Sequence, residues 1–168
     1  MNRRQFLAAA PALVGAASCS KMKTLNIQPL GIVEGGQFGL IRSDQVTNPQ
    51  IYTYTVPADM AFELWTASFQ FTASATVANR LPFISVTAGA DVTWSKFVTN
   101  PVTAGGTLRL WFGVEIAETA VVNGNIWLSI PRLVAPPLSV ISLSATSLQL
   151  GDITSAICMT GRFWPLTR

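Results

Sequence analysis

Histidine is absent from this 168-residue chain, and charged residues make up only 11% of it. The eight Asp and Glu residues are spread thinly, and the two cysteines, Cys19 and Cys158, stand near opposite ends. Catalytic sites are usually built from clustered His, Asp, Glu, Cys or Lys side chains, so this chain has little material for chemistry. Zinc would lack its usual ligands for the same reason. The sequence therefore predicts no catalytic, cofactor or metal site.

Sequence motifs for chemistry are missing as well. There is no Gly-x-Ser-x-Gly elbow, no Walker loop and no dinucleotide fingerprint. Glu115 with Glu118, and Asp91 with Lys96, are the pairs that acid-base catalysis would need, but we expect Glu115 and Glu118 to be solvated surface carboxylates. Asp152 follows Gly151 in a turn, where its carboxylate is expected to bind nearby backbone N–H groups. Cation binding is the alternative role for Asp152.

Positive charge is concentrated at the start of the chain. The net charge is +3, and Arg3, Arg4 and Lys21 account for all of it, because residues 1–21 contain no Asp or Glu. Residues 22–168 are therefore neutral overall, and their basic residues are isolated rather than clustered. This distribution argues against nucleic acid as a direct partner, since phosphate binding needs a continuous basic surface.

Aromatic side chains are plentiful by contrast, with five tryptophans and nine phenylalanines. A surface with few charges does little to keep monomers apart, and aromatic residues are prominent in protein interfaces. We therefore expect contacts with copies of this chain and with neighbouring proteins through Trp65, Trp94, Trp111, Trp127 and Trp164. Trp111 lies opposite the apolar face of its predicted strand and so needs cover from a second sheet, a partner or a ligand. A carbohydrate-stacking platform is the alternative use of these rings.

Residues 1–21 form a separate segment with three interpretations. A charged start, a short apolar stretch and small residues before Cys19 are typical of a signal peptide. The run from Arg3 to Leu7 resembles a twin-arginine export signal, and Ala16 to Cys19 resembles a lipoprotein box without its leucine. The alternatives are an Ala-rich helix over residues 6–18 that packs on a neighbouring subunit, or a true start at Met22.

Period-2 alternation dominates the rest of the chain. Residues 22–49 are rich in glycine and predict an extended arm with one short strand over 38–41. Residues 50–168 predict the folded domain, with strands over 50–56, 61–72, 81–87, 91–99, 107–116, 125–130, 138–144 and 154–164. The strand over 61–72 is expected to be central and Pro82 to begin a strand, and Asn123-Gly124 is the strongest hairpin-turn signal. Together these elements predict an all-β antiparallel sandwich of about eight strands, with jelly-roll topology.

Four segments of the predicted domain carry a family resemblance. They are Tyr52–Ala58, Thr72–Arg80, the Ile130-Pro131 step and Leu150–Ile157. In this order they resemble recurring turn-and-strand segments of small β-sandwich structural proteins encoded in tailed-phage and environmental viral genomes, although Asp59 stands where glycine is usual. The resemblance spans roughly residues 50–164, and it implies a fold and a place in a virus particle rather than a catalytic residue.

Two functions remain as expectations. The first is a structural subunit of a virion, as a minor capsid, decoration or head-tail accessory protein that acts by assembly. The alternative is an exported bacterial surface or periplasmic module, a lipoprotein if Cys19 is acylated, that recognises a glycan or protein. A membrane enters only if the N-terminal signal or the lipidation of Cys19 is real.

Overall fold

The computed structural model describes residues 28–33, 36–47 and 51–166, with side chains over 36–43 and 51–166. The described residues form eleven β-strands and no helix. The strands are β1 (Gln28–Val33), β2 (Gly36–Thr47), β3 (Tyr52–Thr55), β4 (Met60–Thr72), β5 (Pro82–Ala88), β6 (Asp91–Phe97), β7 (Thr107–Val114), β8 (Asn125–Ile130), β9 (Leu133–Ala135), β10 (Val140–Ala145) and β11 (Ile153–Pro165).

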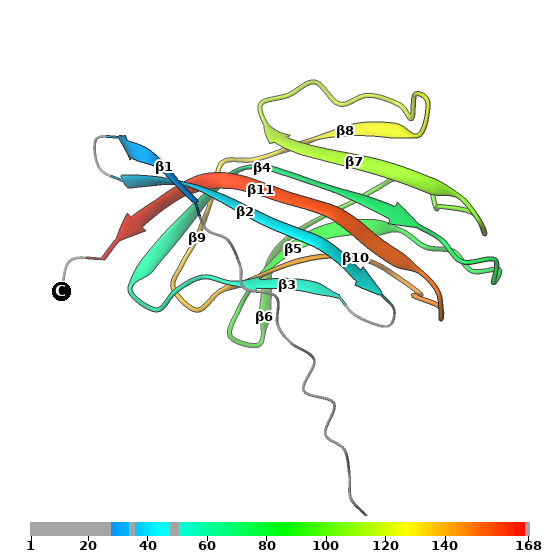
Figure 1. Cartoon of the computed structure of the whole chain (residues 1–168), viewed down its shortest axis with the longest axis horizontal. Coiled ribbons are helices and arrows are strands. Elements are labelled where there is room, and N and C mark those ends of the chain that lie inside the picture. The colour runs from blue at the N-terminus through cyan, green and yellow to red at the C-terminus, as the bar shows by residue number, and fades with distance from the viewer. Residues whose placement is uncertain (1–27, 34–35, 48–50, 167–168) are drawn as a thin grey trace, which may run out of the picture.

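Two sheets pack face to face, as Figure 1 shows. The seven-stranded sheet has the order β1-β2-β11-β4-β7-β8, and β9 pairs with β4 beside this path. The four-stranded sheet has the order β3-β10-β5-β6. The expected all-β sandwich is confirmed.

The pairing of eight strands is that of a jelly roll. Strand β2 pairs with β11, β3 with β10, β4 with β7 and β5 with β6, so the pairs are nested in chain order. Such a set is one long antiparallel hairpin rolled into two layers. Contacts between β11 and β4 and between β10 and β5 close the layers. Strands β1, β8 and β9 are additions to this frame.

Alternation along the strands builds the core between the sheets. Phe62, Leu64, Phe69 and Phe71 of β4 point inward and are buried, and so are Tyr52, Tyr54 and Val56 on and just after β3. The predicted inward face of β7 is confirmed at Leu108, Leu110 and Phe112. Each fully buried apolar side chain contributes about 1.5–3 kcal/mol, so this shared core supplies much of the stabilisation.

Every predicted strand of the domain is present, with small shifts at the ends. Strand β4 lies inside its sheet, and Pro82 is the first residue of β5, both as predicted. The interpretation of residues 22–49 needs correction, because β2 is twelve residues long and pairs with β11 over most of its length. That pairing gives β11 a second neighbour, so the described part of the predicted arm belongs to the sandwich. Residues 1–21, with the predicted signal or interface helix, lie outside the described residues.

The Asn123-Gly124 turn forms, but it does not join two antiparallel strands. Both residues have positive φ, 49° and 72°, and Val122 and Asn125 exchange two backbone hydrogen bonds of 2.9 Å across the turn. Strand β8 nevertheless runs parallel to β7, with Leu110 opposite Ile126. Residues 115–124 therefore carry the chain back to the start of β7. On the way, Thr119 bonds the backbone N–H and C=O of Trp127 at the outer edge of β8.

A fully buried ion pair connects two distant turns. Arg80 Nε donates to Asp152 Oδ2 at 2.8 Å, and neither side chain is exposed. Asp152 also accepts hydrogen bonds from the backbone N–H groups of Ser74 and Gln149, at 2.8 and 2.7 Å. The predicted turn role of Asp152 is thus confirmed, and the carboxylate in addition neutralises a buried guanidinium. This pair connects residues 72–80 with residues 150–157, two of the segments that carry the family resemblance.

Candidate functional site: the outer face of the seven-stranded sheet

Four of the five tryptophans lie on one surface. Trp65, Trp111, Trp127 and Trp164 alternate with inward-facing residues of β4, β7, β8 and β11, so they occupy the outer face of the seven-stranded sheet. Trp94 of β6 instead packs against the core between the sheets. The structure therefore brings four of the five expected interface residues together and separates the fifth from them.

The face has a fixed aromatic cluster around Arg162, made of Trp65, Trp164, Arg162 and Phe38. Arg162 Cζ lies 5.1 Å from the ring centroid of Trp65 and 5.0 Å from that of Trp164. Phe38 meets Trp65 edge-on at 5.2 Å. A cation held by two indole faces gains on the order of 1 kcal/mol per contact, so these rings are held in place by one another.

Glu63 is the carboxylate of this region, and it is only 1% exposed. It accepts hydrogen bonds from Arg132 Nε and from Trp164 Nε1, the latter at 3.2 Å. Burial alone would raise the pKa of Glu63, but hydrogen bonds from Arg132, Trp164 and Trp65 bring its pKa below the ordinary value of 4.5. Glu63 is therefore an ionised acceptor rather than a proton donor at neutral pH.

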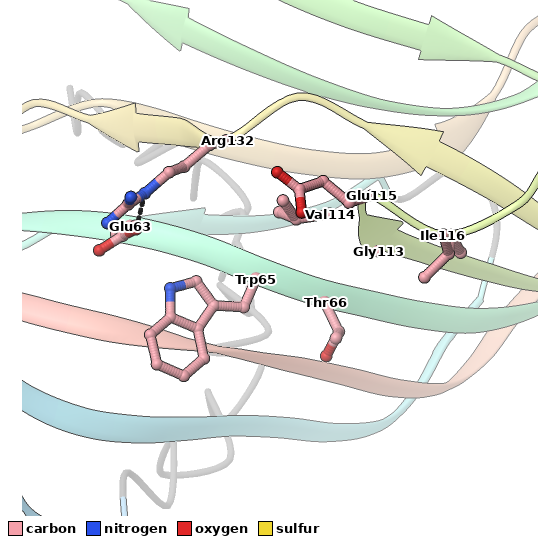
Figure 2. A pocket seen from close by; sticks show the side chains of 8 residues that line it. All are labelled: Glu63, Trp65, Thr66, Gly113, Val114, Glu115, Ile116 and Arg132. Carbon is pink, nitrogen blue, oxygen red and sulfur yellow. Dashed lines mark hydrogen bonds and ion pairs between the residues drawn. The ribbon is translucent and has the colours of Figure 1, made fainter.

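A hollow of about 400 Å³ opens beside Glu63. It lies where β4 changes its partner, because β7 pairs with β4 from Thr66 onward and β9 pairs with it up to Leu64. Trp65 falls between the two as the extra residue of a β-bulge opposite β11. The lining residues, drawn in Figure 2, are Glu63, Trp65, Thr66, Gly113, Val114, Glu115, Ile116 and Arg132.

A second group of side chains lies on β7 and β8, and we call Arg109, Trp111 and Trp127 the β7–β8 patch. Trp111 and Trp127 are register partners, and Arg109 Cζ lies 4.9 Å from the ring centroid of Trp111. The indole nitrogen of Trp111 is buried without a hydrogen-bond partner. Trp127 is 39% exposed, which is high for so large an apolar ring. The need for cover that the sequence indicated for Trp111 is met only in part, by Arg109.

The outer face of the four-stranded sheet is free of charge along its central rows. Thr53, Ser142, Ser85 and Ser95 lie side by side across the four strands. The neighbouring rows contain Thr55, Val140, Thr87 and Val92, and then Phe83 and Phe97 with Ser144, which is itself buried. Such a surface offers hydroxyl and apolar contacts only.

The carboxylate pairs considered from the sequence are arranged as surface groups. Glu118 binds Lys96 Nζ at 2.6 Å, and this hydrogen bond lowers the pKa of Glu118 below 4.5. Lys96 is thus engaged by Glu118 rather than Asp91, and Glu115 is exposed at the rim of the hollow. Within the described ranges there is no cluster of three or more Cys, Asp or Glu that would suit a metal ion. The same residues include no helix able to cross a membrane.

Sequence reasoning missed Glu63 and Arg132. One signal was present, because Glu63 is the only ionisable residue in the apolar and aromatic strand around it, and a buried carboxylate needs a partner. The identity of that partner carries no local signal, since Arg132 is 69 residues away in sequence.

Comparison of the chain with protein-family models, with curated proteins and with solved structures finds no match.

Proposed function

We propose that this protein is a non-enzymatic structural subunit of a virus particle, which assembles with copies of itself and with neighbouring proteins through the outer face of its seven-stranded sheet. One observation carries the proposal: four tryptophans share that face, and the only carboxylate among its described strand side chains, Glu63, is already paired with Arg132. The face therefore combines large apolar rings with cations and has little negative charge.

The β7–β8 patch is the part of the face that most favours a protein partner. Trp and Arg are the residue types that most often dominate binding energy at protein interfaces. A stable contact buries about 1,600 Å² in total, so the patch would be the centre of a wider surface across β7 and β8.

Three further features support a virion setting. Jelly rolls recur in viral capsids, although lectins share the fold, so architecture alone is not decisive. The uncharged rows of the four-stranded sheet give a second surface on which neighbouring subunits can pack without desolvating ions. The resemblance of residues 50–164 to phage-encoded sandwich proteins points in the same direction.

Light scattering coupled to size-exclusion chromatography tests the assembly mechanism on the full chain. We expect the wild type to elute as an oligomer and Trp127→Ser to shift the population towards monomer. Val77→Ser is the matched control, because Val77 is 91% exposed but lies in the loop between β4 and β5, away from the face. A wild-type monomer at high concentration, or equal effects of the two variants, would contradict the mechanism.

The setting needs a separate test. We expect peptides of this chain, in constant ratio to the major capsid protein, when purified particles carrying its gene are analysed by mass spectrometry. Particles that lack the chain would reject the virion role and leave any self-association intact.

An exported binding module is the second candidate, and the hollow beside Glu63 is the observation that favours it. Intact-mass measurement of the native protein distinguishes the two settings. Loss of ~20 residues or addition of lipid supports export, whereas an intact Met1 or a start at Met22 supports the virion role.

A further inference from the structure

We propose that the hollow lined by Glu63, Trp65, Glu115 and Arg132 is a binding site for a neutral saccharide ring. The hollow lies on the same outer face as the β7–β8 patch but is lined by other residues, and this inference does not rest on the assembly role. The volume of about 400 Å³ falls within the range of about 300–1,000 Å³ that is typical of small-molecule sites.

The polar groups of the hollow select for hydroxyls. Glu115 is an exposed acceptor, Arg132 is a donor, and the Thr66 hydroxyl is both, whereas Glu63 is buried and its two oxygens are bonded to Arg132 and Trp164. The lining has two carboxylates and one guanidinium, so its excess negative charge disfavours an anionic ligand. A neutral hydroxyl can accept from Arg132 and donate to a carboxylate at once, and hydrogen bonds to charged groups are about twice as strong as neutral ones.

The apolar part of the lining fits the C–H surface of a sugar ring. Trp65, Val114 and Ile116 contribute it, and Figure 2 shows the Trp65 indole along one side with its nitrogen turned towards Glu63. Gly113 adds no side chain, so the backbone at the end of β7 remains open to the hollow. Aromatic and aliphatic walls with a few converging polar groups are the usual composition of ligand sites.

The groups are also held in place before any ligand arrives. Glu63 fixes Arg132 through Nε, which leaves the terminal guanidinium nitrogens free to donate, and the Arg132 side chain is 69% exposed. Glu63 is held in turn by Trp164, and Trp65 by Phe38 and Arg162. Glu115 has a φ of 58°, a left-handed conformation that non-glycine residues seldom adopt and that often accompanies function. Rigid placement of this kind lowers the entropic cost of binding.

Indole N–H signals in ¹⁵N-labelled protein provide the test, because each of the five tryptophans gives one signal. The full chain is titrated with the methyl glycosides of glucose, galactose, mannose and N-acetylglucosamine. We expect at least one of them to shift the Trp65 signal with a dissociation constant of about 1 mM, and to leave the Trp127 signal in place. Glucuronate, which is an anion, should bind at least tenfold more weakly than the neutral sugar.

Variants locate the binding site. Glu115→Gln should weaken binding about tenfold and leave the spectrum otherwise folded, whereas Trp127→Phe should change nothing. The proposal fails if no neutral sugar shifts the Trp65 signal at ~50 mM, if the Trp127 signal shifts instead, or if glucuronate binds as tightly as the neutral sugar. Oligomerisation of the same samples is read independently, so the loss of one property does not imply the loss of the other.

Discussion

Replacing Asp152 by asparagine should destabilise the protein strongly, because it leaves a guanidinium buried without a counter-charge. Arg80 is completely inaccessible and has Asp152 as its carboxylate partner at 2.8 Å. Its remaining contacts are Ser74 Oγ at 2.9 Å and the backbone carbonyl of Ala78 at 3.4 Å, neither of which is charged. Removal of one member of a buried ion pair typically costs about 3–5 kcal/mol.

The assay is thermal and urea unfolding followed by far-ultraviolet circular dichroism. For a domain of this size 1 kcal/mol corresponds to about 2–4 °C, so Asp152→Asn should lower Tm by about 6–20 °C. The double variant Arg80→Met with Asp152→Asn should lose less than the sum of the single variants, since removal of the cation removes the uncompensated charge. Glu118→Gln is the control, because its pair with Lys96 is exposed and its loss should leave Tm unchanged.

The effect of pH follows from the pKa of Asp152. Burial acts to raise this pKa, but hydrogen bonds from Arg80, Ser74 and Gln149 hold it below the ordinary value of 3.8. The folded chain therefore binds this proton less tightly than the unfolded chain, so the stabilisation is complete above 3.8 and is lost as the pH falls through the folded pKa. The difference in the free energy of unfolding between wild type and Asp152→Asn should be constant near neutral pH and should become smaller below pH 3.8. A difference of less than about 1 kcal/mol at pH 7, or one that does not narrow in acid, would refute the reasoning.

Three further predictions concern packing and backbone conformation. Gly161→Ala should prevent stable folding or lower Tm sharply, because its Cβ would lie 2.6 Å from the buried Phe62 ring; an unchanged Tm in a thermal melt would contradict the packing. Trp94→Ala should cost up to about 3–5 kcal/mol in urea unfolding, whereas Trp127→Ala should cost far less, because only Trp94 packs against the core. Leu138 has a φ of 61° and is exposed, so Leu138→Gly should match or exceed wild type in Tm and Leu138→Val should fall below it.

Alternation was sufficient to predict the strands and the side of each strand that faces the core. Leu108, Leu110 and Phe112 recur at every second position, and in an extended chain that spacing places all three on one face. The same rule placed Trp111 on the opposite face. Within residues 36–47 the sequence predicted only one short strand, over 38–41, because glycines and polar residues weaken the alternation there. In the structure these residues form a long strand by pairing with β11.

The sequence did not predict which strands pair or which charged side chains form ion pairs. The parallel alignment of β8 with β7, the contact between Arg80 and Asp152 and the approach of Arg132 to Glu63 all join residues that no short-range pattern relates. Alternation along the chain was enough to predict an all-β fold, and composition was enough to predict a surface with little charge and many tryptophans. That four tryptophans share a face while Trp94 packs inward follows from the tertiary structure. Local alternation places each side chain on one side of its own strand. The packing of the two sheets then determines which side becomes the interior.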